Sequence, residues 1–336
     1  MNGFITDMAA AMGVRTTPSI LTAVEDFGVN PGHLGMQIFV PEGLQQGAPL
    51  VTILHGCKQD PEDYALGSGW PTLAQRHGFA LLFPTQSRLN NPLRCFNWFD
   101  PEASQNEVAS ILAMIGHAVD SHSLDAGRVF VTGLSAGGAL TAALLAASPG
   151  SFAGGGIIAG MPFGAAAGGM EALNEMRDPT PATPVEWGDK VRAASDFSGR
   201  RPIVTIWQGT ADTTVNPANA DALEAQWADV MGLDAGRVTT ERFGIDHCRV
   251  WTDAKGEVRL RRWHIEGLEH GTPISPNAVD EPRRLGQKAR FMLESRLSST
   301  WLLARDWSLV PAERTGARWS GPLQATLCPT RWRRPG

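Results

Sequence analysis

Short apolar runs recur along the chain, and amphipathic stretches separate them. Each run is apolar at nearly every position, which is typical of strands that are buried on both faces of a parallel sheet. We predict strands at Leu50–Leu54, Gly78–Pro84, Arg128–Gly133, Gly156–Ala159, Pro202–Trp207 and Val258–Ile265. The last of these alternates apolar with polar side chains, so we expect that strand to be half-exposed.

Between the runs, apolar residues recur at the spacing of a helix face. One apolar stripe is formed by Val108, Ile111, Leu112, Ile115 and Val119. Ala136–Ala147 is rich in Ala and Leu and ends at Ser-Pro-Gly, and Leu223–Met231 has another amphipathic pattern. Strands that alternate with helices predict βαβ units, and therefore an α/β fold in which helices cover both faces of a mostly parallel sheet.

The composition narrows the class of protein. With 336 residues, 43% hydrophobic and 19% charged, the chain can bury a large core, which excludes global disorder. The net charge of -5 argues against a nucleic-acid partner, which would need a basic face. Residues 129–170 carry no charge, but Gly and Pro interrupt them repeatedly, so we expect no membrane span. The cysteines form no CxxC pair, so we expect no zinc or other metal site.

We expect a single catalytic domain over residues 1–310 and a separate tail over residues 311–336. The tail has five Arg against one Glu, and we expect it to be poorly ordered and solvated, with contact to an acidic partner as the alternative. The first residues lack the basic and apolar segments of a secretory signal. We therefore expect a cytoplasmic protein, or a secreted one if a leader has been trimmed. The oligomeric state stays open.

The segment Gly133-Leu-Ser-Ala-Gly137 matches the pattern GxSxG, and it lies between a predicted strand and the Ala/Leu-rich helix. This arrangement is that of a nucleophile elbow, a sharp strand-to-helix turn that exposes the serine Oγ. The flanking glycines are needed because side chains there would clash with neighbouring backbone. We predict that Ser135 is a nucleophile; the alternative is an ordinary serine in a Gly-rich turn.

A serine at its usual pKa is a weak nucleophile and needs a base, which in this architecture follows an acid later in the chain. Asp212 comes directly after the fifth predicted strand, at the same sheet edge as Ser135, and is the predicted acid. The alternative is an Asx-turn aspartate. His270 follows the last strand between two glycines and is the predicted base, whereas His247 and His264 are interpreted as structural or surface histidines.

The loop after the first predicted strand, His55-Gly-Cys57, supplies a backbone N–H to the oxyanion hole in this architecture. We therefore predict that the N–H groups of Cys57 and Ala136 form the oxyanion hole. Cys57 as a nucleophile is a weaker alternative, because no nearby pattern provides it with a His-Asn or His-Asp pair. The predicted chemistry requires no metal or organic cofactor.

Taken together, these segments resemble polyhydroxybutyrate (PHB) depolymerase-type esterases, a branch of the α/β-hydrolase superfamily that includes feruloyl and acetyl-xylan esterases. The resemblance runs from about Asn30 to Trp307 and is carried by residues 50–59, 91–99, 131–138, 209–219 and 267–273, in that order. It implies an α/β-hydrolase fold. It also implies hydrolysis of short-chain 3-hydroxyacyl or related esters, as small molecules or oligomers, through Ser135, Asp212 and His270.

The resemblance further implies roles for the segment Cys95-Phe-Asn-Trp-Phe99. It places this segment near the cleft, so Asn97 and Trp98 are candidate substrate contacts, with a core aromatic as the equal alternative for Trp98. Because both matching segments carry a cysteine, the resemblance also favours a Cys57–Cys95 disulfide.

Some features depart from the family pattern. Many members carry a linker and a polymer-binding module, and neither is seen here, which favours oligomers or soluble esters over crystalline polymer. The segment Asn277–Ser299, the Arg/Trp tail and the residues before Asn30 are atypical. A feruloyl or acetyl-xylan-type carbohydrate esterase is the alternative function. A serine peptidase or acyltransferase on the same scaffold, and a noncatalytic binding protein, are less favoured.

Overall fold

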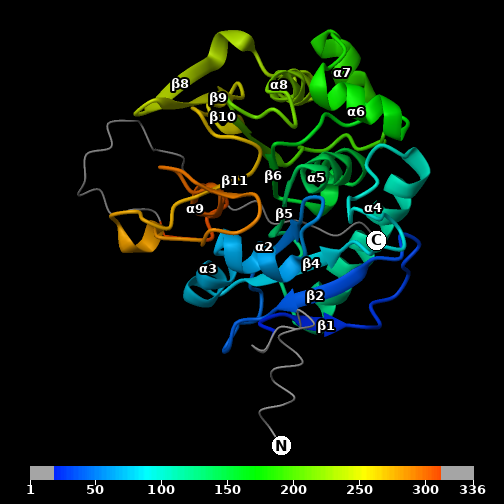
Figure 1. The fold of residues 1–336 in the computed structure, drawn as a ribbon, viewed down its shortest axis with the longest axis vertical. Helices are drawn as coiled ribbons and strands as arrows, with labels where there is room; N and C mark the ends of the chain where they lie inside the picture. The colour runs from blue at the N-terminus through cyan, green and yellow to red at the C-terminus, as the bar shows by residue number, and fades with distance from the viewer. Residues whose placement is uncertain (1–18, 312–336) are drawn as a thin grey trace, which may run out of the picture.

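The computed structural model describes residues 19–311 and is built around one ten-stranded sheet (Figure 1). In pairing order, its strands are β1 (Thr22–Val24), β2 (Gly35–Phe39), β4 (Ala80–Thr85), β3 (Leu50–Leu54), β5 (Val129–Leu134), β6 (Gly154–Ile158), β7 (Ile203–Gly209), β10 (Val258–Ile265), β9 (Asp246–Thr252) and β8 (Val238–Phe243). Residues 1–18 and the predicted tail beyond residue 311 lie outside the described residues.

The centre of the sheet is parallel, as the apolar runs predict. Strands β4, β3, β5, β6, β7 and β10 pair with one another in parallel, and each corresponds to a predicted strand. The two margins are antiparallel hairpin-like additions, β1–β2 on one side and β9–β8 on the other. Because parallel strands end at a common edge, the loops after β3, β5, β7 and β10 can meet.

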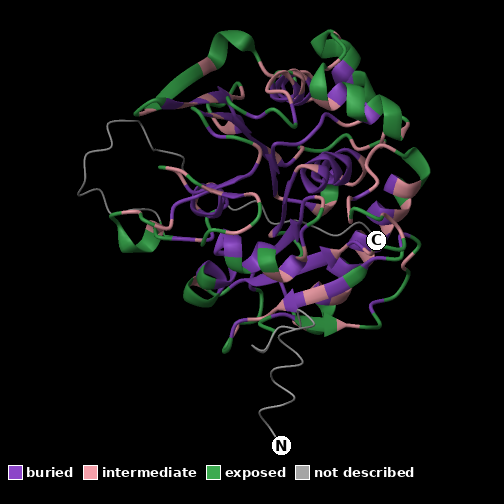
Figure 2. Cartoon of the chain, in the orientation of Figure 1, coloured by how far each residue is buried: buried purple, intermediate pink, exposed green. Residues whose placement is uncertain are grey.

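Helices cover both faces of the sheet, because successive side chains of a strand point to opposite faces. On β3, Leu50 and Leu54 pack with one apolar cluster, whereas Val51 and Ile53 pack with the other. The first cluster is covered by α4 (Pro101–Ser121), α5 (Ala136–Ala147) and α8 (Ala218–Val230). The second is covered by α2 (Pro61–Ser68), α3 (Trp70–His77) and α9 (Ser299–Asp306). Figure 2 shows the buried sheet between these partly exposed helices.

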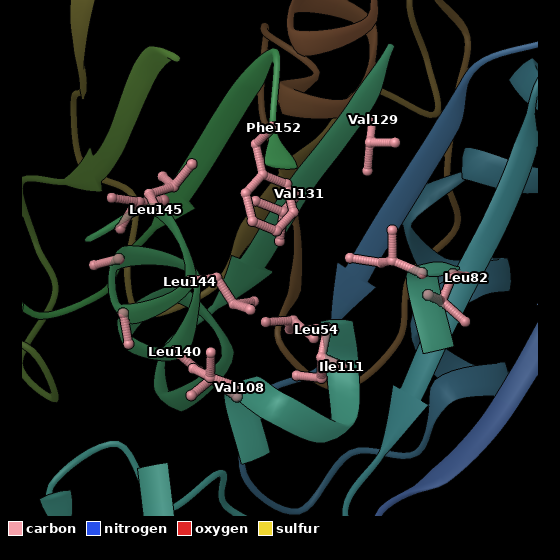
Figure 3. Close-up of a cluster of buried hydrophobic side chains, with 14 of the residues drawn as sticks. Leu54, Leu82, Val108, Ile111, Val129, Val131, Leu140, Leu144, Leu145 and Phe152 are labelled. Atoms are coloured by element: carbon pink, nitrogen blue, oxygen red, sulfur yellow. The ribbon is translucent and has the colours of Figure 1, made fainter. Parts of the chain in front are cut away.

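The first cluster shows how the helices hold the sheet. In Figure 3, Leu144 of α5 and Ile111 of α4 lie near Leu54 of β3, and Leu140 of α5 lies beside Val108 of α4. All five side chains are buried, and only Val108 keeps some exposure, at 7%. Truncation of such a leucine to alanine costs about 2–5 kcal/mol of folding free energy. Helix α5, which follows Ser135, is thus fixed against the sheet and α4.

Two shorter helices and several small elements complete the described chain. The helices α6 (Gly169–Arg177) and α7 (Pro184–Arg192) follow β6, and α7 packs against α8. Residues 178–183 form the loop between these two helices, and Pro184 begins α7. Single 3-10 turns lie at Pro149–Ser151, Ala235–Arg237 and Glu281–Arg283. None of the helices described between residues 19 and 311 is long and apolar enough to cross a bilayer.

The prediction that Val258–Ile265 is half-exposed is wrong. Arg261 and Arg262 of β10 are buried, and helices on both faces of the sheet supply carboxylates to them. Arg262, 3% exposed, lies 3.1 Å from Glu224 of α8, and Arg261 lies 3.2 Å from Asp306 of α9. An alternation of polar and apolar residues does not show whether the charged side chains face solvent or a buried carboxylate.

The atypical segment 277–299 folds over the carboxyl edge of the sheet. It contributes β12 (Met292–Glu294), which pairs in parallel with β11 (Thr272–Ile274), and the N-terminus of α9. The segment is tied to the loop after β3, since Gln59 Nε2 donates to the Arg290 carbonyl oxygen over 2.7 Å. It therefore links the loop that carries His270 to the loop that carries Cys57.

Candidate active site

Ser135 lies in the turn between β5 and α5 with a strained backbone. Its φ of 58° and ψ of -119° are adopted rarely by non-glycine residues, at a cost of about 1–3 kcal/mol. The turn is tight because Gly133 and Gly137 allow close approach: a Cβ on Gly137 would lie 2.4 Å from the Leu54 carbonyl oxygen. The Ser135 N–H donates to Ile158 over 2.9 Å, which fixes the turn to the end of β6. The side chain of Ser135 stays partly exposed at the carboxyl edge of the sheet.

Asp212 and His270 are in direct contact. His270 Nδ1 lies 2.8 Å from Asp212 Oδ2, so the Nδ1–H donates to the carboxylate and leaves Nε2 with a free lone pair. Asp212 is 4% exposed as a residue, and its Oδ1 accepts hydrogen bonds from the N–H groups of Thr214 and Val215 at 2.8 and 2.9 Å. Gln208 Nε2 donates to Oδ2 over 3.0 Å. These donors compensate the burial of the charged carboxylate and hold its orientation.

The loops of Asp212 and His270 are joined through their backbones. A Cβ on Gly209 would lie 2.1 Å from the Leu268 carbonyl oxygen, so only glycine allows this crossing. The Ala211 N–H donates to the same Leu268 oxygen over 3.0 Å. On its other side, the His270 ring meets the edge of Phe291 with ring centroids 5.9 Å apart. The imidazole is therefore fixed between the β7 loop and the segment that carries β12.

Ser135 and His270 reach the same edge of the sheet from β5 and β10, but no hydrogen bond joins their side chains in this part of the structure. Hydrogen bonds of a catalytic group are often long or poorly aligned before a substrate binds. The structure thus brings the predicted acid and base into contact, and the Ser135 turn follows β5 at the same edge of the sheet.

The predicted oxyanion loop lies against the serine turn. A Cβ on Gly137 would lie 2.6 Å from the His55 carbonyl oxygen, so the start of α5 contacts this loop directly. Among the described residues the Cys57 N–H has no hydrogen-bond acceptor. The Ala136 N–H lies in the first turn of α5, where N–H groups lack an intrahelical acceptor. Both predicted donors therefore remain available.

Cys57 is bonded to Cys95, with 38 residues of sequence separation, as the resemblance favours. The bridge joins the loop after β3 to the segment that contains Asn97 and Trp98. The alternative that Cys57 is a nucleophile is wrong for this oxidised state, because its sulfur is not free. Of the cysteines in residues 19–311, only Cys248 is unbridged, and it is buried.

A buried polar network supports both loops, and sequence reasoning missed it. Glu107, 1% exposed, accepts hydrogen bonds from Gln86 Nε2 at 2.6 Å and from the Asn97 backbone at 2.9 Å. Burial raises the pKa of Glu107 to about 7. The Gln86 N–H donates to His55 Nε2 over 3.1 Å, and His55 Nδ1 lies 2.8 Å from the Gly56 oxygen. Burial lowers the pKa of His55 to about 4, so this imidazole is neutral and structural near pH 7.

The predicted substrate contacts have partners within the protein. Asn97 Nδ2 donates to Glu107 over 2.9 Å, and Asn97 Oδ1 accepts from Asn91 over 2.9 Å. Trp98 is partly buried against the core and meets Phe99 edge-on, with ring centroids 5.7 Å apart.

The other two histidines considered in the sequence, His247 and His264, are interpreted there as structural or surface residues. They lie on β9 and β10 and stack on each other, with ring centroids 4.3 Å apart. Within residues 19–311, no group of His, Cys, Asp and Glu is arranged to hold a metal ion.

Known proteins that are similar to this chain include esterases and depolymerases. The Esterase PHB depolymerase family matches residues 34–244. Poly(3-hydroxyalkanoate) depolymerase C of Paucimonas lemoignei is 35% identical over 86% of this chain and 70% of its own length. Feruloyl esterase B of Thermothelomyces thermophilus is 32% identical over 79% of this chain and 93% of its own.

A solved structure has the same fold. The acetyl xylan esterase from Aspergillus awamori superposes with a TM-score of 0.67 at 27% identity, over 74% of this chain and 93% of that one. The elbow at Ser135, the mostly parallel sheet and these relatives agree on an α/β-hydrolase and on carboxylic ester hydrolysis. The chain belongs to the PHB depolymerase family of esterases.

Proposed function

We propose that this esterase hydrolyses short-chain (3-hydroxy)acyl esters, including polyhydroxyalkanoate-type oligomers, through Ser135, His270 and Asp212. The observation that carries the proposal is the 2.8 Å contact between His270 Nδ1 and Asp212 Oδ2 at the sheet edge where the strained Ser135 turn ends. With Nδ1–H held by the carboxylate, Nε2 is free to act as a base. The sequence order of serine, acid and histidine is that of the elbow architecture.

In the proposed reaction, His270 Nε2 removes the Ser135 proton as Oγ attacks the ester carbonyl carbon. The imidazolium that forms is stabilised by Asp212, which stays ionised. The tetrahedral intermediate collapses when His270 returns the proton to the alcohol oxygen, which leaves an acyl-enzyme. Water, deprotonated by His270, then attacks this acyl group and releases the carboxylic acid and free Ser135.

The N–H groups of Cys57 and Ala136 are the proposed donors to the oxyanion. One such donor is typically worth about 3 kcal/mol of transition-state stabilisation. The unpaired Cys57 N–H and the position of Ala136 at the helix start support this role. Asn97 and Trp98 remain proposed substrate contacts, and the hydrogen bonds of Asn97 to Glu107 and Asn91 suggest that its main effect is to shape the cleft wall.

The substrate class is inferred from the relatives. A depolymerase of poly(3-hydroxyalkanoate) covers the larger share of this chain, which favours 3-hydroxyacyl esters. The feruloyl esterase and the acetyl xylan esterase favour a second candidate, de-esterification of a carbohydrate. A panel of 3-hydroxybutyrate oligomers, methyl ferulate and acetylated xylan, compared by kcat/KM, distinguishes the two candidates.

Turnover of p-nitrophenyl butyrate by the wild type and Ser135→Ala tests the proposal. We expect kcat to fall by a factor of about a million, as when the nucleophile of a serine triad is removed. Ser121→Ala, which alters an exposed serine on α4, is the matched control and should retain full activity. Unchanged turnover in Ser135→Ala would reject the assignment, and faster cleavage of matched amides than esters would favour a peptidase.

A further inference from the structure

A cavity of about 390 Å³ lies at the sheet edge opposite to Ser135. It is formed by the loop between α7 and β7, the end of α8 and the β9–β10 turn; α7 and α8 lie side by side in Figure 1. Arg201 precedes β7 and Arg259 lies at the start of β10, whereas Asp212 and His270 follow the ends of these strands. A strand of seven residues spans about 23 Å, so the cavity is separate from the candidate active site.

Two of the four arginines that line the cavity are already neutralised. Arg192 and Arg200 are largely exposed, and each has two carboxylate partners. The partners are Asp189 and Asp229, both at 2.7 Å from Arg192, and Asp253 and Glu257 for Arg200. Asp253 is the one carboxylate in the cavity lining, and it is engaged by Arg200.

The other two arginines are neutralised less completely, because Asp253 and Glu257 attract Arg259 without forming a direct ion pair with it. Within residues 19–311, neither Arg201 nor Arg259 forms an ion pair with a carboxylate. Arg259 is only 6% exposed, and its guanidinium donates one hydrogen bond, to the carbonyl oxygen of Arg201. The Nη1 of Arg201 is buried with no acceptor. A guanidinium carries five N–H donors and keeps its charge, so both residues have donors left for an anion that the protein does not supply.

Apart from the charged residues and from Ser198 and Gly199, the cavity wall has four apolar side chains. Phe197, Val230, Met231 and Leu233 line the cavity, and all four are half-buried. A small inorganic anion would leave this wall in contact with water, whereas an aliphatic chain would cover it. The planar fork of a guanidinium matches a carboxylate with two parallel hydrogen bonds.

We infer that this cavity binds a short aliphatic carboxylic acid, with Arg201 and Arg259 holding the carboxylate and Phe197, Met231 and Leu233 holding the chain. The inference does not depend on the proposed function, because none of these residues lies at the catalytic edge of the sheet.

Titration calorimetry of the full-length protein with hexanoate, and separately with inorganic phosphate, tests the inference. We expect hexanoate to bind more tightly than phosphate, because phosphate leaves the apolar wall unused. Arg201→Gln should weaken hexanoate binding by about tenfold or more, as expected for loss of charge-assisted hydrogen bonds. Arg201→Lys keeps the charge but loses the fork, and should weaken binding to a smaller extent.

Two controls isolate the cavity. Arg237→Gln removes an exposed arginine outside the lining, 3.8 Å from Asp234, and should leave hexanoate binding unchanged. Covalent labelling of Ser135 with an organophosphonate fills the candidate active site, and the labelled protein should bind hexanoate as the unlabelled protein does, which excludes that site as the location. If Arg201→Gln loses its far-UV circular dichroism, Arg201→Lys decides the question. Hexanoate binding that is equal in the wild type and the folded Arg201 variants, or phosphate binding as tight as hexanoate binding, overturns the inference.

Discussion

The Cys57–Cys95 disulfide connects the predicted oxyanion loop to the segment with Asn97, so its removal should affect stability and catalysis together. The double variant Cys57→Ala/Cys95→Ala removes the crosslink without leaving reactive thiols. In the chain-entropy account, a closed loop of 38 residues restricts the unfolded chain by about 13 cal/mol/K. At 25 °C this corresponds to about 4 kcal/mol, which is the expected loss in free energy of unfolding.

The catalytic loss should have a different character from the loss of stability. The loop keeps its hydrogen bonds from Gly56 N–H to Gln59 and from Gln59 to Arg290, so the fold around it remains. What changes is the precision with which the Cys57 N–H is held in the position that its proposed role as oxyanion donor requires. We expect kcat to fall by up to about a hundredfold, as for a weakened oxyanion donor, with a smaller change in KM.

Urea unfolding followed by circular dichroism measures the first quantity, and p-nitrophenyl butyrate kinetics well below the unfolding midpoint measure the second. Cys248→Ala is the control, since Cys248 is unbridged and buried away from the loop. Treatment of the wild type with dithiothreitol should reproduce the double variant. A double variant with wild-type kcat would refute the idea that the crosslink positions the oxyanion donor, whatever its stability.

Three further predictions concern other parts of the site. Asp212→Asn should lower kcat about ten-thousandfold with little change in KM for p-nitrophenyl butyrate, because the amide favours the wrong tautomer of His270; a loss below tenfold would contradict the proposed role. Burial raises the pKa of Glu107 from 4.5 to about 7, so between these pH values the folded chain holds a proton that the unfolded chain has released, and stability falls by about 3 kcal/mol as pH rises. Urea unfolding at pH 5 and pH 8 should show that fall in the wild type and not in Glu107→Gln, and an equal pH slope in both would assign it to other groups. Gly209→Ala should unfold at lower urea concentration and lose activity, since a Cβ would lie 2.1 Å from the Leu268 oxygen, whereas the open-space control Gly116→Ala should match the wild type in activity.

The parallel strands were predictable because each is a short apolar run, and burial on both faces is the physical cause of that pattern. Strand β8 could not be predicted in this way, because its central residues Thr-Thr-Glu-Arg are polar and exposed. It forms a strand because it pairs with β9. Arg261 and Arg262 of β10 read as an exposed face in the sequence, because their carboxylate partners come from α9 and α8, far away in sequence.

At the candidate site, Asp212 and His270 could be found because each follows a predicted strand directly. Their support could not be found in the same way. Gln208 has a local signal, since it ends an apolar run four residues before Asp212. Glu107, by contrast, is one polar residue on an amphipathic helix, and only the fold brings it to Gln86 and Asn97. The pairing of the cysteines came from the resemblance and not from their spacing.

The close approach of Gly209 to the Leu268 carbonyl oxygen couples the loop after β7 to the loop after β10. The loops that carry Asp212 and His270 are joined by a backbone hydrogen bond from Ala211 to Leu268. A displacement of one loop should therefore displace the other. We therefore expect Asp212 and His270 to move together as one unit, whereas Ser135, on its own turn before α5, moves separately. Damage to either loop should disable both groups at once, so that combining two such lesions costs little more activity than one.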